Sequence, residues 1–135
     1  MSISPVLDSD GASISKFDEE TVLIKFKDGA NVRLDEAIEI RDKSMVLFPE
    51  KKFLALIDAT GIFGTIAPDA MNFFARDKEL TKRRMAQAIV VDNLPLRILA
   101  TFYLRVKKPA REARIFNKIE DATRWLAERK HLVEN

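Results

Sequence analysis

Two short, strongly apolar segments constrain the fold of this chain more than any other feature. They are residues 53–58 (FLALID) and residues 86–92, which include the run AIVVD. Each has the length of a strand and is followed by apolar residues at helical spacing. Strands that alternate with helices predict a mostly parallel sheet. The first run has no polar residue before its end, which is typical of a central strand covered on both faces.

The residues before the first apolar run predict a hairpin and a helix. Two alternating segments, residues 12–17 and 21–27, indicate a β-hairpin with one buried face. The side chains expected on that face are Val22, Ile24 and Phe26. After a short extended link, Asp35 is expected to cap a helix over residues 35–45.

Three further helices are expected in the second half. The first begins near Pro68, where the missing N–H of proline costs nothing, and its buried stripe is expected to be Ala70, Phe73 and Phe74. The second ends before Pro109. Its apolar residues at helical spacing are Ile98, Leu99, Phe102, Tyr103 and Val106.

The last helix follows a short strand at residues 113–116. Asn117 with Glu120 three residues later forms a pattern like a capping box, and Ile119, Ala122, Trp125 and Leu126 follow at helical spacing.

The composition is that of a soluble globular domain of 135 residues, with 47% hydrophobic and 33% charged residues. A net charge of +2 is too small to demand a nucleic-acid partner, and none is expected. The absence of cysteine excludes disulfides, thiolate metal sites and cysteine nucleophiles. With no apolar run of about 20 residues and no signal-peptide pattern, we expect a cytoplasmic protein without stable membrane insertion.

Several stretches together resemble the STAS-like family, whose fold is that of sporulation anti-sigma-factor antagonists, and in particular its small bacterial members of unknown role. The stretches that carry the resemblance are residues 56–60 (LIDAT), 72–75 (NFFA), 88–91 (AIVV), 102–109 (FYLRVKKP), 114–117 (RIFN) and 122–126 (ATRWL). The resemblance implies an α/β fold with a mixed, mostly parallel sheet, an N-terminal β-hairpin and about four helices. We expect one STAS-like domain over residues 12–130, preceded by a flexible arm or edge strand (1–11) and followed by a tail (131–135).

In regulatory members of that family, the loop after the central strand carries a phosphorylatable serine that controls binding to a kinase-like anti-sigma factor. Alanine and proline stand near those positions here, at Ala67 and Pro68. The remaining hydroxyls are those of Thr60 and Thr65, close to Asp69 in the first turn of the next helix. These threonines are candidate switch residues for phosphate at a helix N-terminus, and the alternative is that they are loop and capping hydroxyls.

Two aspartates follow neighbouring strands of the predicted sheet. Asp58 and Asp92 would lie at the carboxyl ends of those strands, where open α/β sheets place ligand-binding groups. Two carboxylates there could share a proton or a metal, although such residues more often cap the following loop. We identify no catalytic set, metal-ligand cluster or cofactor motif, and the one histidine, His131, lies in the expected tail.

Adjacent aromatic residues occur twice, as Phe73-Phe74 and Phe102-Tyr103. Neighbours on a helix diverge by about 100°, so both members of a pair cannot point into one core. One member of each pair is therefore a candidate for a pocket or subunit interface. Basic residues gather in 76–84 and 105–114, interleaved with acidic ones, as on a solvated face.

Three functional hypotheses follow. The first is a non-enzymatic bacterial regulatory or scaffold domain that acts through protein–protein contacts and forms a homodimer. The second is a carrier of a small apolar or lipid-like ligand, which a fully packed core would contradict. The third and weakest is an enzyme that uses Asp58 and Asp92.

Overall fold

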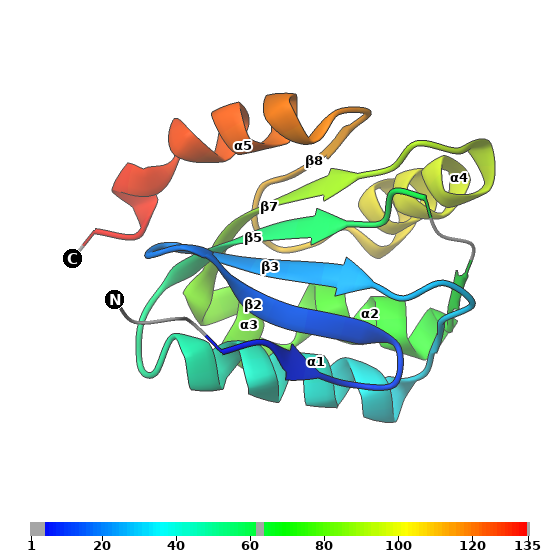
Figure 1. Cartoon of the computed structure of the whole chain (residues 1–135), viewed down its shortest axis with the longest axis horizontal. Coiled ribbons are helices and arrows are strands. Elements are labelled where there is room, and N and C mark those ends of the chain that lie inside the picture. The colour runs from blue at the N-terminus through cyan, green and yellow to red at the C-terminus, as the bar shows by residue number, and fades with distance from the viewer. Residues whose placement is uncertain (1–4, 62–63, 135) are drawn as a thin grey trace.

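The computed structural model describes residues 5–61 and 64–134, and it contains a six-stranded sheet with the strand order β1-β2-β3-β5-β7-β8 (Figure 1). The first three strands pair antiparallel, and from β3 onward every pairing is parallel. The mostly parallel sheet expected from the sequence is confirmed. The strands are β1 (Leu7–Asp8), β2 (Ala12–Asp18), β3 (Thr21–Phe26), β5 (Phe53–Asp58), β7 (Arg84–Val90) and β8 (Ala113–Phe116).

Helices cover both faces of this sheet (Figure 1). One face carries α1 (Leu34–Leu47), α2 (Pro68–Arg76), α3 (Lys78–Arg83) and α4 (Leu94–Phe102), the last continuing into the π-helical segment η1 (Tyr103–Lys107). The other face carries α5 (Ile119–Ala127), and a 3-10 turn, η2 (Lys130–Leu132), follows it. None of the helices in the described ranges is long and apolar enough to cross a bilayer.

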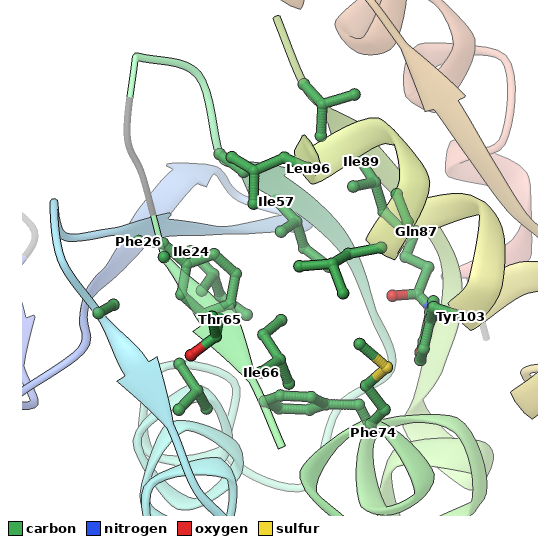
Figure 2. Close-up of a pocket in the computed structure, with 18 of the residues that line it drawn as sticks. Ile24, Phe26, Ile57, Thr65, Ile66, Phe74, Gln87, Ile89, Leu96 and Tyr103 are labelled. Atoms are coloured by element: carbon green, nitrogen blue, oxygen red, sulfur yellow. The ribbon is translucent and has the colours of Figure 1, made fainter. Parts of the chain in front are cut away.

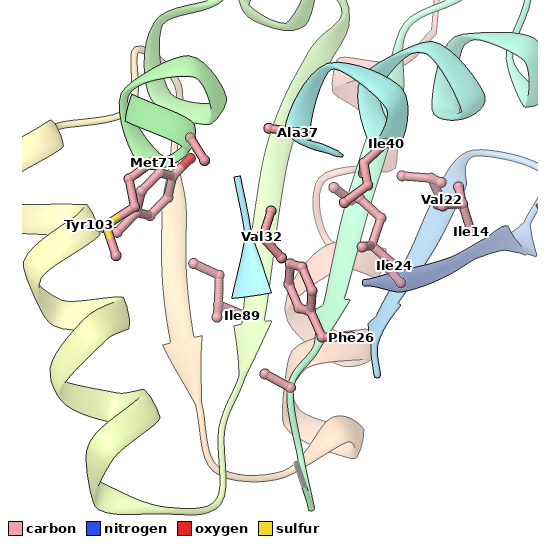
Figure 3. Packing of buried hydrophobic residues seen from close by; sticks show 14 of the residues in the cluster. Ile14, Val22, Ile24, Phe26, Val32, Ala37, Ile40, Met71, Ile89 and Tyr103 are labelled. Carbon is pink, nitrogen blue, oxygen red and sulfur yellow. The ribbon is translucent and has the colours of Figure 1, made fainter. Parts of the chain in front are cut away.

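The central strand β5 divides the core into two clusters. Because successive strand side chains point to opposite faces, Phe53 and Ala55 pack with α1, α2 and α4, whereas Leu54 and Leu56 pack with α5. The buried face of the hairpin joins the first cluster as predicted: Val22, Ile24 and Phe26 lie beside Ile40 and Val32 (Figure 3).

A second, two-stranded sheet was not predicted. Strand β4 (Asn31–Val32) pairs parallel with β6 (Thr65–Ile66), and backbone hydrogen bonds link Thr65 N to Ala30 O at 2.8 Å and Ala67 N to Val32 O at 2.9 Å. Strands of two residues are too short to show a sequence period. This small sheet ties the entry of α1 to the entry of α2.

The faces of two helices differ from expectation. In α2 the buried residues are Ala70, Met71 and Ala75, while Phe73 and Phe74 are half-buried. In α4 and η1 the buried residues are Leu96, Ala100 and Tyr103, whereas Ile98, Phe102 and Val106 are exposed. Both helices carry apolar residues on more than one side, so the spacing of apolar residues in the sequence could not predict which side is buried.

Some boundaries also differ. Helix α1 begins at Leu34 with Arg33 as the N-cap, so Asp35 lies inside the first turn rather than capping it. Asn117 does not cap α5, whose N-cap is Lys118, because the Asn117 side chain accepts a hydrogen bond from Arg97 of α4. Strand β7 runs over Arg84–Val90 rather than 86–92, and the unpredicted helix α3 occupies the charged stretch before it.

Candidate functional site

A cavity of about 90 Å³ lies between the sheet and helices α2 and α4 (Figure 2). Its walls are formed mainly by aliphatic and aromatic side chains from the sheet, the small β4–β6 sheet and the two helices. They include Ile24, Phe26, Ile57, Ile66, Ile89 and Leu96. Protein interiors hold few voids larger than a water molecule, so this space is a distinct feature of the core.

Small residues leave this space open. Ala30, Ala59 and Ala100 line the cavity from three different segments, and Gly64 lines it immediately before β6. A Cβ atom at Gly64 would lie 2.6 Å from the carbonyl oxygen of Ala30, so the backbone approach at this point requires glycine. The cavity results from this close backbone contact together with short side chains.

Two polar side chains meet in the cavity wall. Gln87, on β7, is only 2% exposed, and its Nε2 donates to the hydroxyl of Tyr103 at 2.9 Å. The Oε1 atom of Gln87 is buried and accepts no hydrogen bond within the described chain. Figure 2 shows this amide beside Tyr103 with its oxygen turned toward the open space. A buried acceptor without a donor is uncommon in folded proteins.

Arg84 contributes a buried charge to the same wall. Its side chain lines the cavity, and one guanidinium nitrogen donates to the carbonyl oxygen of Phe74 in the last turn of α2. That carbonyl lies at the negative end of the helix dipole, which favours a cation. None of the ion pairs among the described residues involves Arg84.

Asp58 organises the loop that follows β5. Its Oδ1 accepts hydrogen bonds from the backbone nitrogen and hydroxyl of Thr60, at 2.9 and 2.6 Å, and its Oδ2 pairs with Lys25 at 3.3 Å. Burial acts to raise the pKa of Asp58, but the hydrogen bonds from Thr60 and Lys25 outweigh it and lower the pKa. The carboxylate thus stays ionised and caps the turn.

Asp92 holds the same loop from the neighbouring strand. Both of its carboxylate oxygens accept from the backbone nitrogen of Gly61, at 3.0 and 3.1 Å. The structure therefore brings Asp58 and Asp92 to adjacent residues of one loop, Thr60 and Gly61. Asp58 has the local capping arrangement that the sequence left open as an alternative, whereas Asp92 binds the loop of the neighbouring strand instead of its own.

The other candidate switch residues lie farther along the same segment. The Thr65 hydroxyl donates to Oδ1 of Asn31 at 2.9 Å and thereby links β6 to β4. Asp69 is exposed in the first turn of α2. The hydroxyls of Thr60 and Thr65 are each used in a hydrogen bond within the fold. No cluster of three His, Asp or Glu side chains suited to a metal ion occurs in residues 5–61 and 64–134.

In each adjacent aromatic pair, one side chain faces the cavity and the other does not, as expected for neighbours on a helix. Phe74 and Tyr103 line the cavity. Phe73 instead packs against the Arg41 guanidinium, 5.1 Å from its ring centre, and Phe102 is 42% exposed beneath the ammonium group of Lys107.

The outer face of α4 and η1 carries a row of exposed apolar side chains, and of these the sequence singled out only Phe102 as a candidate interface residue. The row, here called the outer stripe, consists of Leu94, Ile98, Phe102 and Val106, which are 67%, 59%, 42% and 56% exposed. Their regular spacing of four residues is a signal of a helix face, but it cannot show whether that face points inward.

Comparisons with known proteins agree with this architecture. A solved structure of an uncharacterised protein from Shewanella loihica PV-4, from the DUF3478 family and described as having a SpoIIAA-like fold, aligns with a TM-score of 0.53 and 15% sequence identity. The alignment covers 92% of each chain. No curated protein matches the sequence. The fold is thus STAS-like, as the sequence predicted. The model of a domain of unknown function, DUF7793, matches residues 15–130, and the chain therefore belongs to that family.

Proposed function

We propose that the protein is a non-enzymatic regulatory or scaffold domain that binds an acidic segment of a partner protein through the outer stripe. The observation that carries this proposal is the alignment of four large apolar side chains, all more than two-fifths exposed, along one helix face. Scattered exposed apolar residues are ordinary, but a continuous row is typical of an interaction surface.

The charge around the outer stripe indicates the chemistry of the partner. Residues 94–111 contain five basic residues and no acidic ones: Arg97, Arg105, Lys107, Lys108 and Arg111. A partner helix with an apolar face and flanking carboxylates would complement both features. Two copies joined through this face would place like charges together, so we expect the predicted homodimer to use another surface.

A photo-crosslinking amino acid at position 98, introduced in the source cells, tests this proposal. A matched probe at Val46 is the control, because Val46 is 68% exposed on α1 and lies outside the stripe. We expect position 98, but not position 46, to capture a protein through an acidic segment. The captured protein is then purified and titrated with wild type, Ile98→Asp and Val46→Asp at low and high salt.

Support requires that Ile98→Asp weaken binding at least about tenfold, that Val46→Asp leave it unchanged, and that salt weaken the wild-type complex. Capture of only a second copy of this chain would overturn the acidic-partner proposal. So would capture of lipid alone, or an affinity that does not depend on Ile98.

A further inference from the structure

We propose that the cavity beneath α4 is a binding site for a small neutral alcohol or phenol whose hydroxyl donates to Oε1 of Gln87. This inference goes beyond the proposed function and does not depend on it, because the cavity and the outer stripe lie on opposite sides of α4. Leu96 and Ala100 line the cavity, whereas Ile98 and Phe102 lie on the outer stripe.

The size and lining of the cavity limit the body of the ligand. At about 90 Å³ the cavity is smaller than the roughly 150 Å³ apolar cavity that holds benzene in an engineered protein. Most drug-sized ligands need pockets of several hundred Å³. An aliphatic body of a few carbon atoms, or one ring after slight expansion, is therefore the expected limit. The walls around Ile57, Ile66 and Ile89 are apolar, which favours a hydrocarbon body.

The unpartnered Oε1 atom of Gln87 indicates that the head group of the ligand is a hydrogen-bond donor. The Gln87 side chain is buried on β7, where its Nε2 donates to Tyr103 at 2.9 Å and its Oε1 is an acceptor that faces the cavity (Figure 2). A ligand with an O–H group supplies the missing donor, whereas a hydrocarbon leaves the acceptor unsatisfied. A water molecule could also donate to Oε1, but it would leave the apolar walls around Ile57, Ile66 and Ile89 without packing contacts, which the hydrocarbon body of an alcohol or phenol supplies.

An anionic ligand fits less well despite Arg84. A carboxylate has no hydrogen to donate and would bring a negative oxygen toward the amide oxygen of Gln87. The Arg84 guanidinium already donates to the Phe74 carbonyl at the end of α2, which partly compensates its charge. A comparison of a neutral and an anionic probe shows whether Gln87 or Arg84 determines which head group the cavity binds.

The test is an NMR titration of the full chain labelled at isoleucine methyl groups. The probes are phenol, toluene and benzoate, which share a ring but differ in head group. We expect phenol to give saturable shifts at the methyls of Ile57, Ile66 and Ile89, and benzoate to bind more weakly. Absence of saturable shifts with phenol would overturn the site, as would shifts confined to Ile98 or tighter binding of benzoate.

Variants then test the role of the amide. Gln87→Met keeps the length of the side chain but removes the acceptor, so we expect the preference for phenol relative to toluene to fall about fivefold or more from its wild-type value. Tyr103→Phe is the matched control, since it breaks the same Gln87–Tyr103 bond but retains the amide acceptor on the buried strand β7, and the preference for phenol should persist. An equal loss of preference in both variants, or in neither, contradicts the role of Oε1. The wild-type titration decides the existence of the site even if a variant fails to fold.

Discussion

Asp58 accepts two hydrogen bonds from Thr60, one from its backbone nitrogen and one from its hydroxyl, and so fixes the first turn after the central strand. This relationship links part of the stability of the fold to the ionisation of Asp58, which is a buried carboxylate. The pKa of Asp58 is lowered in the folded protein, because the hydrogen bonds from Thr60 and Lys25 outweigh the effect of burial.

The first prediction concerns pH. Since folding lowers the pKa of Asp58, its contribution to stability is fully present above the ordinary carboxyl value of 3.8 and is lost as pH falls through the lower folded value. Asp58→Asn should reduce the free energy of unfolding by about 1 kcal/mol near neutral pH and flatten the acid limb of the stability curve. Urea unfolding across the acid range measures both effects. Asp10→Asn, the same change at an exposed position outside any helix, should leave the curve close to that of wild type. An acid limb in Asp58→Asn identical to that of wild type would contradict the prediction.

The second prediction concerns the close backbone contact at the cavity. Gly64→Ala should destabilise the protein by about 1–3 kcal/mol, because the new Cβ would lie 2.6 Å from the carbonyl oxygen of Ala30 and strain the β4–β6 sheet. Gly11→Ala is the matched control. The closest atom to its Cβ would be the end of the flexible Glu36 side chain, at 2.7 Å, and the next would be Val32 and Ala30 side-chain atoms at 3.4 and 3.7 Å, so the change should stay within about 0.5 kcal/mol. Equal thermal midpoints for the two variants would show that the Ala30 contact relaxes freely.

The third prediction separates the two sides of α4. Leu96→Ala should cost about 2–5 kcal/mol because Leu96 is buried, at 8% exposure, against the sheet. Ile98→Ala should change stability by less than about 0.5 kcal/mol because Ile98 is 59% exposed. Chemical denaturation of both variants provides the measurement, and a larger loss for Ile98→Ala would mean that the outer stripe is covered in solution.

The fourth prediction concerns Arg129, just after α5, and its contacts with Glu112, just before β8, and with Trp125 of α5. Arg129 forms two hydrogen bonds to the Glu112 carboxylate, at 2.7 and 3.0 Å, and its guanidinium lies 3.9 Å from the Trp125 ring centre. Arg129→Ala should therefore cost more stability than Glu112→Ala, because it removes the stacking contact as well as the ion pair.

A double-mutant cycle isolates the ion pair. We expect the Arg129–Glu112 coupling to be no more than about 1 kcal/mol, since Glu112 is half exposed and the pair is screened by solvent. Fluorescence of Trp125, the only tryptophan, reports unfolding. Arg124→Ala serves as the control, because the Arg124 side chain is more exposed than that of Arg129 and stacks on no aromatic ring among the described residues. If Glu112→Ala alone proved as costly as Arg129→Ala, the stacking contribution would be negligible.

The sequence by itself determined the elements whose apolar pattern matches the way they are buried in the fold. Strand β5 is covered on both faces, so its continuous apolar run was sufficient to identify it. The hairpin has one buried face, and its alternation of period two identified Val22, Ile24 and Phe26 correctly. In these elements the local pattern and the tertiary environment carry the same information.

Only the tertiary structure decided the orientation of α4 and the presence of the cavity. A helix with apolar residues on two sides can pack against a sheet with either side. That Leu96 is buried and Ile98 is exposed depends on the sheet beneath α4. The cavity depends on the distance between backbones at Gly64 and Ala30 and on the volumes of side chains from separate segments. A hydrogen-bond vacancy such as that of Gln87 likewise exists only once its neighbours are in place. Sequence periodicity records which residues are apolar, whereas packing determines what each of them contacts.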